Sequence, residues 1–196
     1  MTSHTRSRIK DAALNSFAEI GYHATSMRRL AEDAEVQASA VYHWYPNKEA
    51  LLVSIMDDFL GGLNREVLTA VEQFSDPVDR FAAAVRVHVS YHGLHRRAAF
   101  VTDTEVRALT GPARDRVLSI RDNYEQLFYH LITDGIEAGQ MSCRNPRIAT
   151  LAILLECTGV AVWFRPEGDM SLAEIADIHV DIVLGSLNVT PAARPV

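Results

Sequence analysis

Residues 25–48 read Thr-Ser-Met-Arg-Arg-Leu-Ala-Glu-Asp-Ala-Glu-Val-Gln-Ala-Ser-Ala-Val-Tyr-His-Trp-Tyr-Pro-Asn-Lys, and this stretch decides the fold. Its apolar positions predict two short helices, one that begins near Met27 with Thr25 as its N-cap and one that contains Val41. Ala31 is expected at the crossing of the two helices, and Val36 packs in the turn of about three residues that joins them. Such a pair is typical of a helix-turn-helix, whose second helix enters the major groove of DNA.

The second of these helices offers small or polar side chains for contact with bases. They are Gln37, Ala38, Ser39, Ala40 and His43. A glutamine amide can pair with adenine, and an alanine can contact the methyl group of thymine. The spacing alone also fits a plain pair of packed helices in which Tyr42, Trp44 and Tyr45 are core aromatics.

The rest of the chain shows helical periodicity, and no stretch alternates with the two-residue period of a strand. The sequence therefore predicts an all-α protein of about nine helices, separated mostly by prolines and glycines. After the first three helices, the expected ranges are 47–73, 77–95, 96–109, 111–139, 146–164 and 171–187.

Composition and charge restrict the cellular compartments and the classes of function that are possible for this protein. The chain has 196 residues and a net charge of −6, which argues against a protein that coats nucleic acid. Residues 1–54 hold six basic and six acidic residues, so a neutral head that contacts DNA locally is still possible. The polar N-terminus lacks a secretory signal, and the apolar run Ile148–Phe164 is short for a membrane span and carries Glu156. We therefore expect a cytoplasmic protein without a membrane partner, in which this run is a buried helix.

A longer stretch resembles a known family. The order Gly21-Tyr22, Ala24-Thr25-Ser26-Met27-Arg28, Leu30-Ala31, Val36, Val41-Tyr42-His43-Trp44-Tyr45 and Asn47-Lys48-Glu49-Ala50-Leu51 is similar to the N-terminal domain of TetR-family repressors. The resemblance implies that the DNA-binding residues are Thr25, Ser26, Arg28, Gln37, Ala38, Ser39, Ala40, Tyr42, His43 and Lys48. Of these, Gln37 to Ala40 would read bases, and Thr25, Arg28, Tyr42, His43 and Lys48 would contact phosphates. Glu35 departs from the family, which most often has Gly at this turn; a left-handed glutamate costs about 1 kcal/mol.

The helix pattern and the resemblance together imply a division of the chain. We expect a helix-turn-helix domain over residues 1–50, a helical ligand-binding and dimerisation domain over 51–188, and a tail over 189–196. In the family, the last two helices pair with their copies, and here they carry the apolar run Ile148–Phe164 and a stripe formed by Leu172, Ile175, Ala176, Ile182 and Val183. A homodimer also suits a palindromic operator, whose half-sites lie about 34–36 Å apart.

A pocket for a small-molecule effector is expected between the helices of the second domain. Its candidate lining residues are Phe59, Leu63, Val87, His88, Tyr91, Phe100, Val101, Tyr124, Phe128, Leu131, Cys157, Ala161, Trp163 and Arg165, each of which also fits a plain core position. The stretches 105–109 and 163–168 resemble TetR-family members that respond to acyl-coenzyme A thioesters. Four arginines suit CoA phosphates, namely Arg96, Arg97, Arg121 and Arg165. The competing effector class is the hydrophobic compounds bound by multidrug-type repressors.

Three histidines, His88, His92 and His95, fall on one helical face, where they suit either a metal site or a polar wall. No neighbouring Cys or carboxylate motif completes a metal site, so we expect the polar wall of a pocket or a solvated face, and no cofactor. The sequence also lacks a Gly-rich phosphate loop, a nucleophile elbow and a paired-carboxylate motif. The prediction is a ligand-responsive transcriptional repressor that is not an enzyme; a helical enzyme or small-molecule carrier is the alternative.

Overall fold

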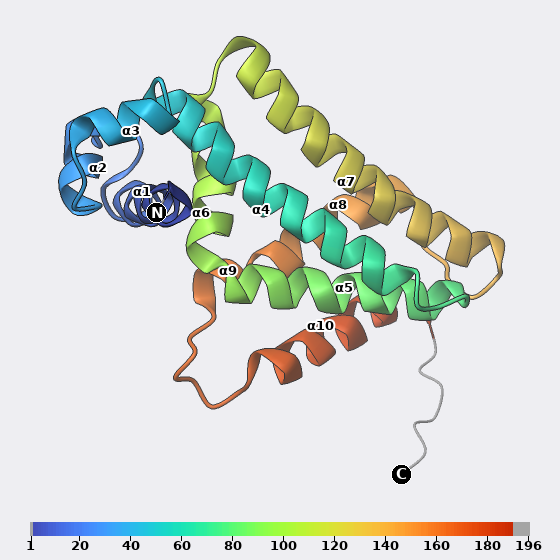
Figure 1. The fold of residues 1–196 in the computed structure, drawn as a ribbon. Coiled ribbons are helices and arrows are strands. Elements are labelled where there is room, and N and C mark those ends of the chain that lie inside the picture. Colours follow the sequence, from blue (N-terminus) through green and yellow to red (C-terminus); the bar gives the residue numbers. More distant parts are fainter. Residues whose placement is uncertain (1, 190–196) are drawn as a thin grey trace. The chain divides into compact units, whose positions relative to one another are not determined.

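The computed structural model describes residues 2–189, and this part of the chain contains helices and no strand (Figure 1). The elements are α1 (Thr2–Ile20), α2 (Met27–Asp33), α3 (Ala38–Trp44), α4 (Lys48–Val71), α5 (Pro77–Leu94), α6 (Arg96–Glu105), η1 (Val106–Ala108), α7 (Gly111–Glu137), α8 (Pro146–Thr158), α9 (Val160–Trp163) and α10 (Leu172–Ser186). The predicted all-α class is confirmed. Apart from Val189, the predicted tail over 189–196 lies outside the described residues.

The helices form two compact units, and the chain crosses between them three times. The first unit runs up to Leu60 and also takes in Arg97–Ser119, whereas the second comprises Gly61–Arg96 and the chain from Ile120 onward. Two crossings lie inside α4 and α7, and the third lies at the start of α6. The first unit therefore contains nearly all of α6 together with α1, α2 and α3, although α6 follows them in sequence by more than fifty residues.

The turn between α1 and α2 corrects one detail of the sequence analysis. Gly21 ends α1 with a left-handed backbone (φ +86°), and the Thr25 hydroxyl donates to its carbonyl at 2.9 Å. Thr25 is thus buried and its hydroxyl is used within the turn, so its prediction as the N-cap of α2 was wrong. Ser26 is the N-cap, because its extended backbone lets its hydroxyl accept the N–H of Arg29 at 3.2 Å.

The second unit is organised around α5, which packs along α10 and also contacts α8 and α9. Gly93 of α5 permits the close approach of α10, because a Cβ there would overlap the Leu172 side chain. The start of α10 has a capping box in which Ser171 and Glu174 bond each other's backbone N–H, so Ser171 is the N-cap. The capping box therefore fixes the residue at which α10 begins.

The apolar run Ile148–Phe164 differs from its prediction as one buried helix. The structure divides it into α8 and α9 at Gly159, and only one side of the two helices packs on α5. The outer side is open in the single chain: Leu155 is 77% exposed, Val162 65% and Trp163 50%. Pro146–Trp163 is the one stretch in the described helices with the length and composition of a membrane span, and 28% of it is buried.

Two adjacent glycines, Gly61 and Gly62, lie in the middle of α4, where the chain leaves the first unit. Their surroundings differ. A Cβ on Gly61 would meet only the Arg65 guanidinium at 3.5 Å, an ordinary contact. A Cβ on Gly62 would overlap the phenol oxygen of Tyr91 and lie 3.1 Å from its ring carbon Cζ. Packing therefore requires glycine at position 62 but not at position 61.

We expect Gly61→Ala to raise the free energy of unfolding and Gly62→Ala to lower it. Alanine gains about 1 kcal/mol of helix propensity over glycine at either position. At position 62, displacement of Tyr91 adds an overpacking cost of about 1–3 kcal/mol. Urea denaturation of the two variants measures the difference, and a stabilised Gly62→Ala would show that Tyr91 moves aside freely.

Candidate nucleic-acid interface and ligand pocket

The turn between α2 and α3 has the geometry that the sequence predicted. Ala31 and Val41 are buried, and the Val36 N–H donates to the Ala31 carbonyl at 2.9 Å. Glu35 adopts the left-handed backbone expected at this turn (φ +51°). Arg8 of α1 donates to the Glu35 carboxylate at 2.8 Å, so a contact from α1 helps to hold the strained turn.

The outer surface of α3 presents the residues predicted to read bases. Gln37, Ala38 and Ser39 are exposed and Ala40 is half-buried. Gln37 is the N-cap residue but makes no side-chain cap bond, so capping does not use its amide. The aromatic run divides by position: Tyr42 and His43 are exposed, Trp44 is half-buried and Tyr45 is buried. Of the three aromatics that could have been core residues, Tyr42, Trp44 and Tyr45, only Tyr45 is fully in the core.

Three of the predicted phosphate-binding residues, Thr25, Arg28 and Lys48, lie in or contact the segment that begins α2, whereas Tyr42 and His43 belong to α3. Arg28 is exposed and forms an ion pair with Glu32 at 3.0 Å within α2. Lys48 is half-buried, and its ammonium donates to the carbonyls of Tyr22 and Thr25 at 2.6 Å each. The same ammonium lies 4.3 Å from the centre of the Tyr22 ring. Burial lowers the pKa of Lys48, and the charge of Glu105 opposes this effect. Lys48 therefore joins α4 to the turn that precedes α2.

The predicted ligand-lining residues belong to both compact units. Phe59, Phe100 and Val101 belong to the first unit, where Phe100 is partly exposed. The others lie in the second unit: Leu63, Val87, His88, Tyr91, Tyr124, Phe128, Leu131, Cys157, Ala161, Trp163 and Arg165. Within it, Tyr124, Phe128 and His88 make mutual ring contacts. Trp163 and Arg165 instead line a separate pocket.

The interior of the second unit holds a hydrogen-bonded network around His88. Its Nδ1 is bonded to the Tyr124 hydroxyl at 2.9 Å and its Nε2 to the Thr158 hydroxyl at 3.1 Å. The His92 ring stacks on the His88 ring at 4.1 Å, and its Nδ1–H donates to the His88 carbonyl at 2.8 Å. His88 and His92 are thus buried and not part of a solvated face, whereas His95 is exposed and its ring contacts that of Tyr91.

Burial keeps this network uncharged. It lowers the pKa of His92 to about 4, and burial together with the neighbouring His92 lowers the pKa of His88 well below its usual range. Burial also raises the pKa of Tyr124, and it raises the pKa of Cys157 to about 12, so this thiol is unreactive. Among the described residues, no group of three or more His, Cys, Asp or Glu side chains could hold a metal ion.

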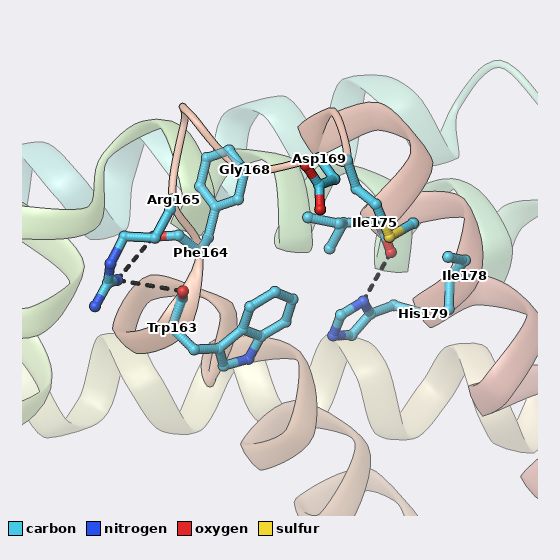
Figure 2. Close-up of a pocket in the computed structure, with 9 residues that line it drawn as sticks. Trp163, Phe164, Arg165, Gly168, Asp169, Ile175, Ile178 and His179 are labelled. Atoms are coloured by element: carbon cyan, nitrogen blue, oxygen red, sulfur yellow. Dashed lines mark hydrogen bonds between the residues drawn. The ribbon is translucent and has the colours of Figure 1, made fainter.

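A cavity of about 400 Å³ opens between α9, the following loop and α10 (Figure 2). Trp163 and His179 lie with parallel rings whose centres are 6.0 Å apart, and the His179 Nδ1–H donates to the Ile175 carbonyl at 2.8 Å. The sequence analysis identified Trp163 and Arg165 but missed the remaining lining residues, which are Phe164, Gly168, Asp169, Met170, Ile175, Ile178 and His179. Helical spacing placed Ile175 in the apolar stripe, but it gave no sign that a loop would fold over this residue.

Arg165 lies at this pocket, but one of its nitrogens is already bonded. Nη1 donates to the carbonyls of Val162, Trp163 and Phe164 at 3.0–3.2 Å, at the C-terminus of α9 (Figure 2). This contact satisfies carbonyls that the end of a helix leaves without partners. Any phosphate contact by Arg165 would have to use its other N–H groups.

Comparison with known families identifies the chain. Residues 9–55 match the family "Bacterial regulatory proteins, tetR family", and residues 75–187 match "Tetracyclin repressor-like, C-terminal domain". The chain belongs to the TetR family. It is thus a DNA-binding transcriptional regulator of this family and not an enzyme, as the sequence predicted.

Relatives of the TetR-family chain span nearly its whole length. The transcriptional repressor KstR2 of Rhodococcus jostii (strain RHA1) is 27% identical over 94% of this chain and 92% of its own length. A solved TetR-family regulatory protein from Rhodococcus RHA1 has a TM-score of 0.89 at 27% identity, covering 95% of this chain and 98% of that one. AibR, solved with isovaleryl coenzyme A and operator DNA, shares the fold with a TM-score of 0.83 at 22% identity, covering 95% and 100% of the two chains.

We expect acid to destabilise the second unit through His92. With a folded pKa of about 4 and an unfolded value near 6.5, His92 takes up a proton on unfolding within this pH window. Stability is therefore complete above pH 6.5 and falls as the pH drops toward 4. Between pH 7.5 and pH 5.0 the free energy of unfolding should fall by about 2 kcal/mol, because the full slope of about 1.4 kcal/mol per pH unit is reached only below pH 6.5.

Urea denaturation at pH 7.5, 6.5 and 5.0, with His92→Phe as the comparison, measures this loss. The variant should show a shallower pH dependence, whereas an equal dependence would place the proton uptake elsewhere.

Proposed function

We propose that this TetR-family regulator is a cytoplasmic homodimeric repressor that binds a palindromic operator and is released by a small-molecule effector. The observation that carries the proposal is the match to both the DNA-binding and the C-terminal family descriptions, on a chain whose α3 exposes Gln37, Ala38 and Ser39. Side chains of this size and polarity are suited to base edges in the major groove.

Phosphate contacts would come from the residues around α2, α3 and the start of α4. Ser26 and Arg28 lie at the N-terminus of α2, where helix N–H groups favour an anion. Tyr42 and His43 contribute from the exposed side of α3. Lys48 would reach a phosphate with the N–H that bonds the His23 carbonyl only at 3.4 Å and would keep its short bonds to the Tyr22 and Thr25 carbonyls, whereas buried Thr25 would act by holding the turn.

We expect Gln37→Ala to change base preference at one position of the operator by roughly 1–3 kcal/mol. The exposed amide contributes to base discrimination rather than to general attraction, so affinity for random duplexes should stay nearly constant. Fluorescence anisotropy with single-base variants of a selected 30-base-pair duplex measures this preference. An equal loss on operator and random DNA would contradict a base-reading role.

A homodimer would cover the exposed apolar side of the second unit. Ile148, Leu155 and Val162 are largely exposed along α8 and α9, and Ile178 and Ile182 are exposed on α10. Ile175, Ala176 and Val183 instead face the interior, so the predicted stripe on α10 divides between the core and the surface. Exposed apolar side chains gathered on a few helices are typical of an interaction surface.

Ile182→Glu should abolish the dimer while leaving the monomer folded. Ile182 is half exposed in the single chain, so the charge does not disturb the core, but in a dimer it would be buried without a partner. Light scattering gives the mass, and Ile20→Glu, an exposed isoleucine of the first unit, serves as the control. A stable Ile182→Glu dimer would place the interface elsewhere.

The effector would act by population shift. A ligand that favours a state unable to bind DNA must bind that state more tightly by on the order of 5 kcal/mol for near-complete release. An acyl-CoA thioester is the first candidate, because AibR binds one on the same fold and the second unit here is rich in aromatic side chains such as Tyr124, Phe128 and Trp163. A hydrophobic, drug-like compound is the competing class.

We expect isovaleryl-CoA to release the operator at lower concentration than isovalerate, because only the thioester brings phosphates to the arginines. Trp163→Leu should weaken this response without weakening operator binding, since Trp163 lies outside the first unit. Titration of the labelled protein–operator complex measures both effects. Equal potency of the two compounds would favour the hydrophobic class.

A further inference from the structure

A buried carboxylate links α6 to the turn that precedes α2. Glu105 is the last residue of α6 and is only 8% exposed. Its Oε1 accepts the backbone N–H of Tyr22 at 3.4 Å, across 83 positions of the sequence. Burying a carboxylate is costly unless charges or hydrogen bonds compensate for the lost water, so Glu105 depends on its partners in the turn.

The turn that Glu105 meets is held from two sides. Lys48, from the start of α4, donates to the carbonyls of Tyr22 and Thr25, and its ammonium lies over the Tyr22 ring. Glu105 accepts the Tyr22 N–H, and its charge stabilises the ammonium of Lys48. One peptide segment is thus bonded at its carbonyls by a cation and at an N–H by an anion.

This turn sets the position of α2. The left-handed Gly21 begins it, the Thr25 hydroxyl closes it onto the Gly21 carbonyl, and Ser26 caps α2 directly afterwards. A displacement of the turn would therefore move Ser26 and Arg28, which the proposed function assigns to phosphates. It would also move the carbonyls that orient Lys48.

We propose that Glu105 is a positioning residue for DNA binding, which acts by holding the 21–25 turn and Lys48 in the arrangement that meets the phosphates. The inference rests on the proposed operator binding. It extends the DNA-binding machinery to α6, which shares the first compact unit with α1, α2 and α3. Glu105 never touches DNA in this arrangement and acts through Tyr22 and Lys48.

The direction in which DNA affinity changes on substitution of Glu105 distinguishes a positioning role from a purely electrostatic one. Removing a negative charge from the DNA-binding unit should by itself strengthen attraction to the phosphate backbone. Loss of the positioned 21–25 turn and Lys48 should instead weaken DNA binding. Glu105→Gln removes the charge but keeps an oxygen acceptor, and Glu105→Leu removes both. Glu19→Gln is the matched control, because Glu19 is an exposed carboxylate of the same unit, at the end of α1.

The test uses the full chain and a fluorescein-labelled duplex carrying the sequence that the wild-type protein selects from a random pool. We expect Glu105→Gln to lower affinity for this duplex about tenfold at 20 °C and Glu105→Leu to lower it further, with Glu19→Gln unchanged or slightly tighter. Hydrogen exchange should accelerate at the amides of residues 22–25 in both Glu105 variants. Thermal melts establish that each variant is folded at the temperature of the binding measurement.

Two results would overturn the inference. The first is operator affinity within twofold of the Glu19→Gln control in folded Glu105 variants. The second is a loss of affinity that matches the unfolded fraction, which would make Glu105 a stability residue only. Failure of the wild-type protein to select any sequence is a different outcome, because it would remove the proposed operator binding and this inference with it.

Discussion

The bond between the Lys48 ammonium and the carbonyls of Tyr22 and Thr25 fixes the relation between α4 and the helix-turn-helix. A half-buried ammonium needs several oxygen partners, and the 21–25 turn supplies them only when Gly21 is left-handed and Thr25 is turned inward. The cap at Ser26, the direction of α2 and the exposure of α3 all follow from that turn. The position of α2 therefore depends on backbone groups of the preceding turn.

The sequence predicted the local features of this head because they depend on short-range chemistry. The apolar spacing of Ala31 and Val41 was visible in residues 25–48, whereas the left-handed position at Glu35 came from the resemblance to a family that most often has Gly at this turn. The cap at Ser26 was not, because Thr25 and Ser26 are equally good cap residues and only the bond from Thr25 to Gly21 decides between them.

What the sequence did not predict depends on which segments meet. No local pattern shows that Glu105 reaches Tyr22, that Phe59, Phe100 and Val101 lie in the first unit, or that the loop after α9 encloses a pocket against α10. The apolar composition of α8 and α9 predicted burial, yet a single chain can cover only one side of them. Periodicity indicates which face of a helix is apolar. It does not indicate whether that face packs against the same chain or against another molecule.

The paired glycines of α4 give this helix a point of low bending stiffness. Elsewhere along α4, side chains restrict the backbone, but Gly61 has no Cβ and Gly62 is constrained only through its contact with Tyr91. Thermal bending of a 24-residue helix will concentrate at such a point. In the proposed operator complex, which requires one arrangement of α3, suppression of such bending would carry an entropic cost. A molecule that altered the amplitude of the motion would change operator affinity even if the mean structure stayed the same.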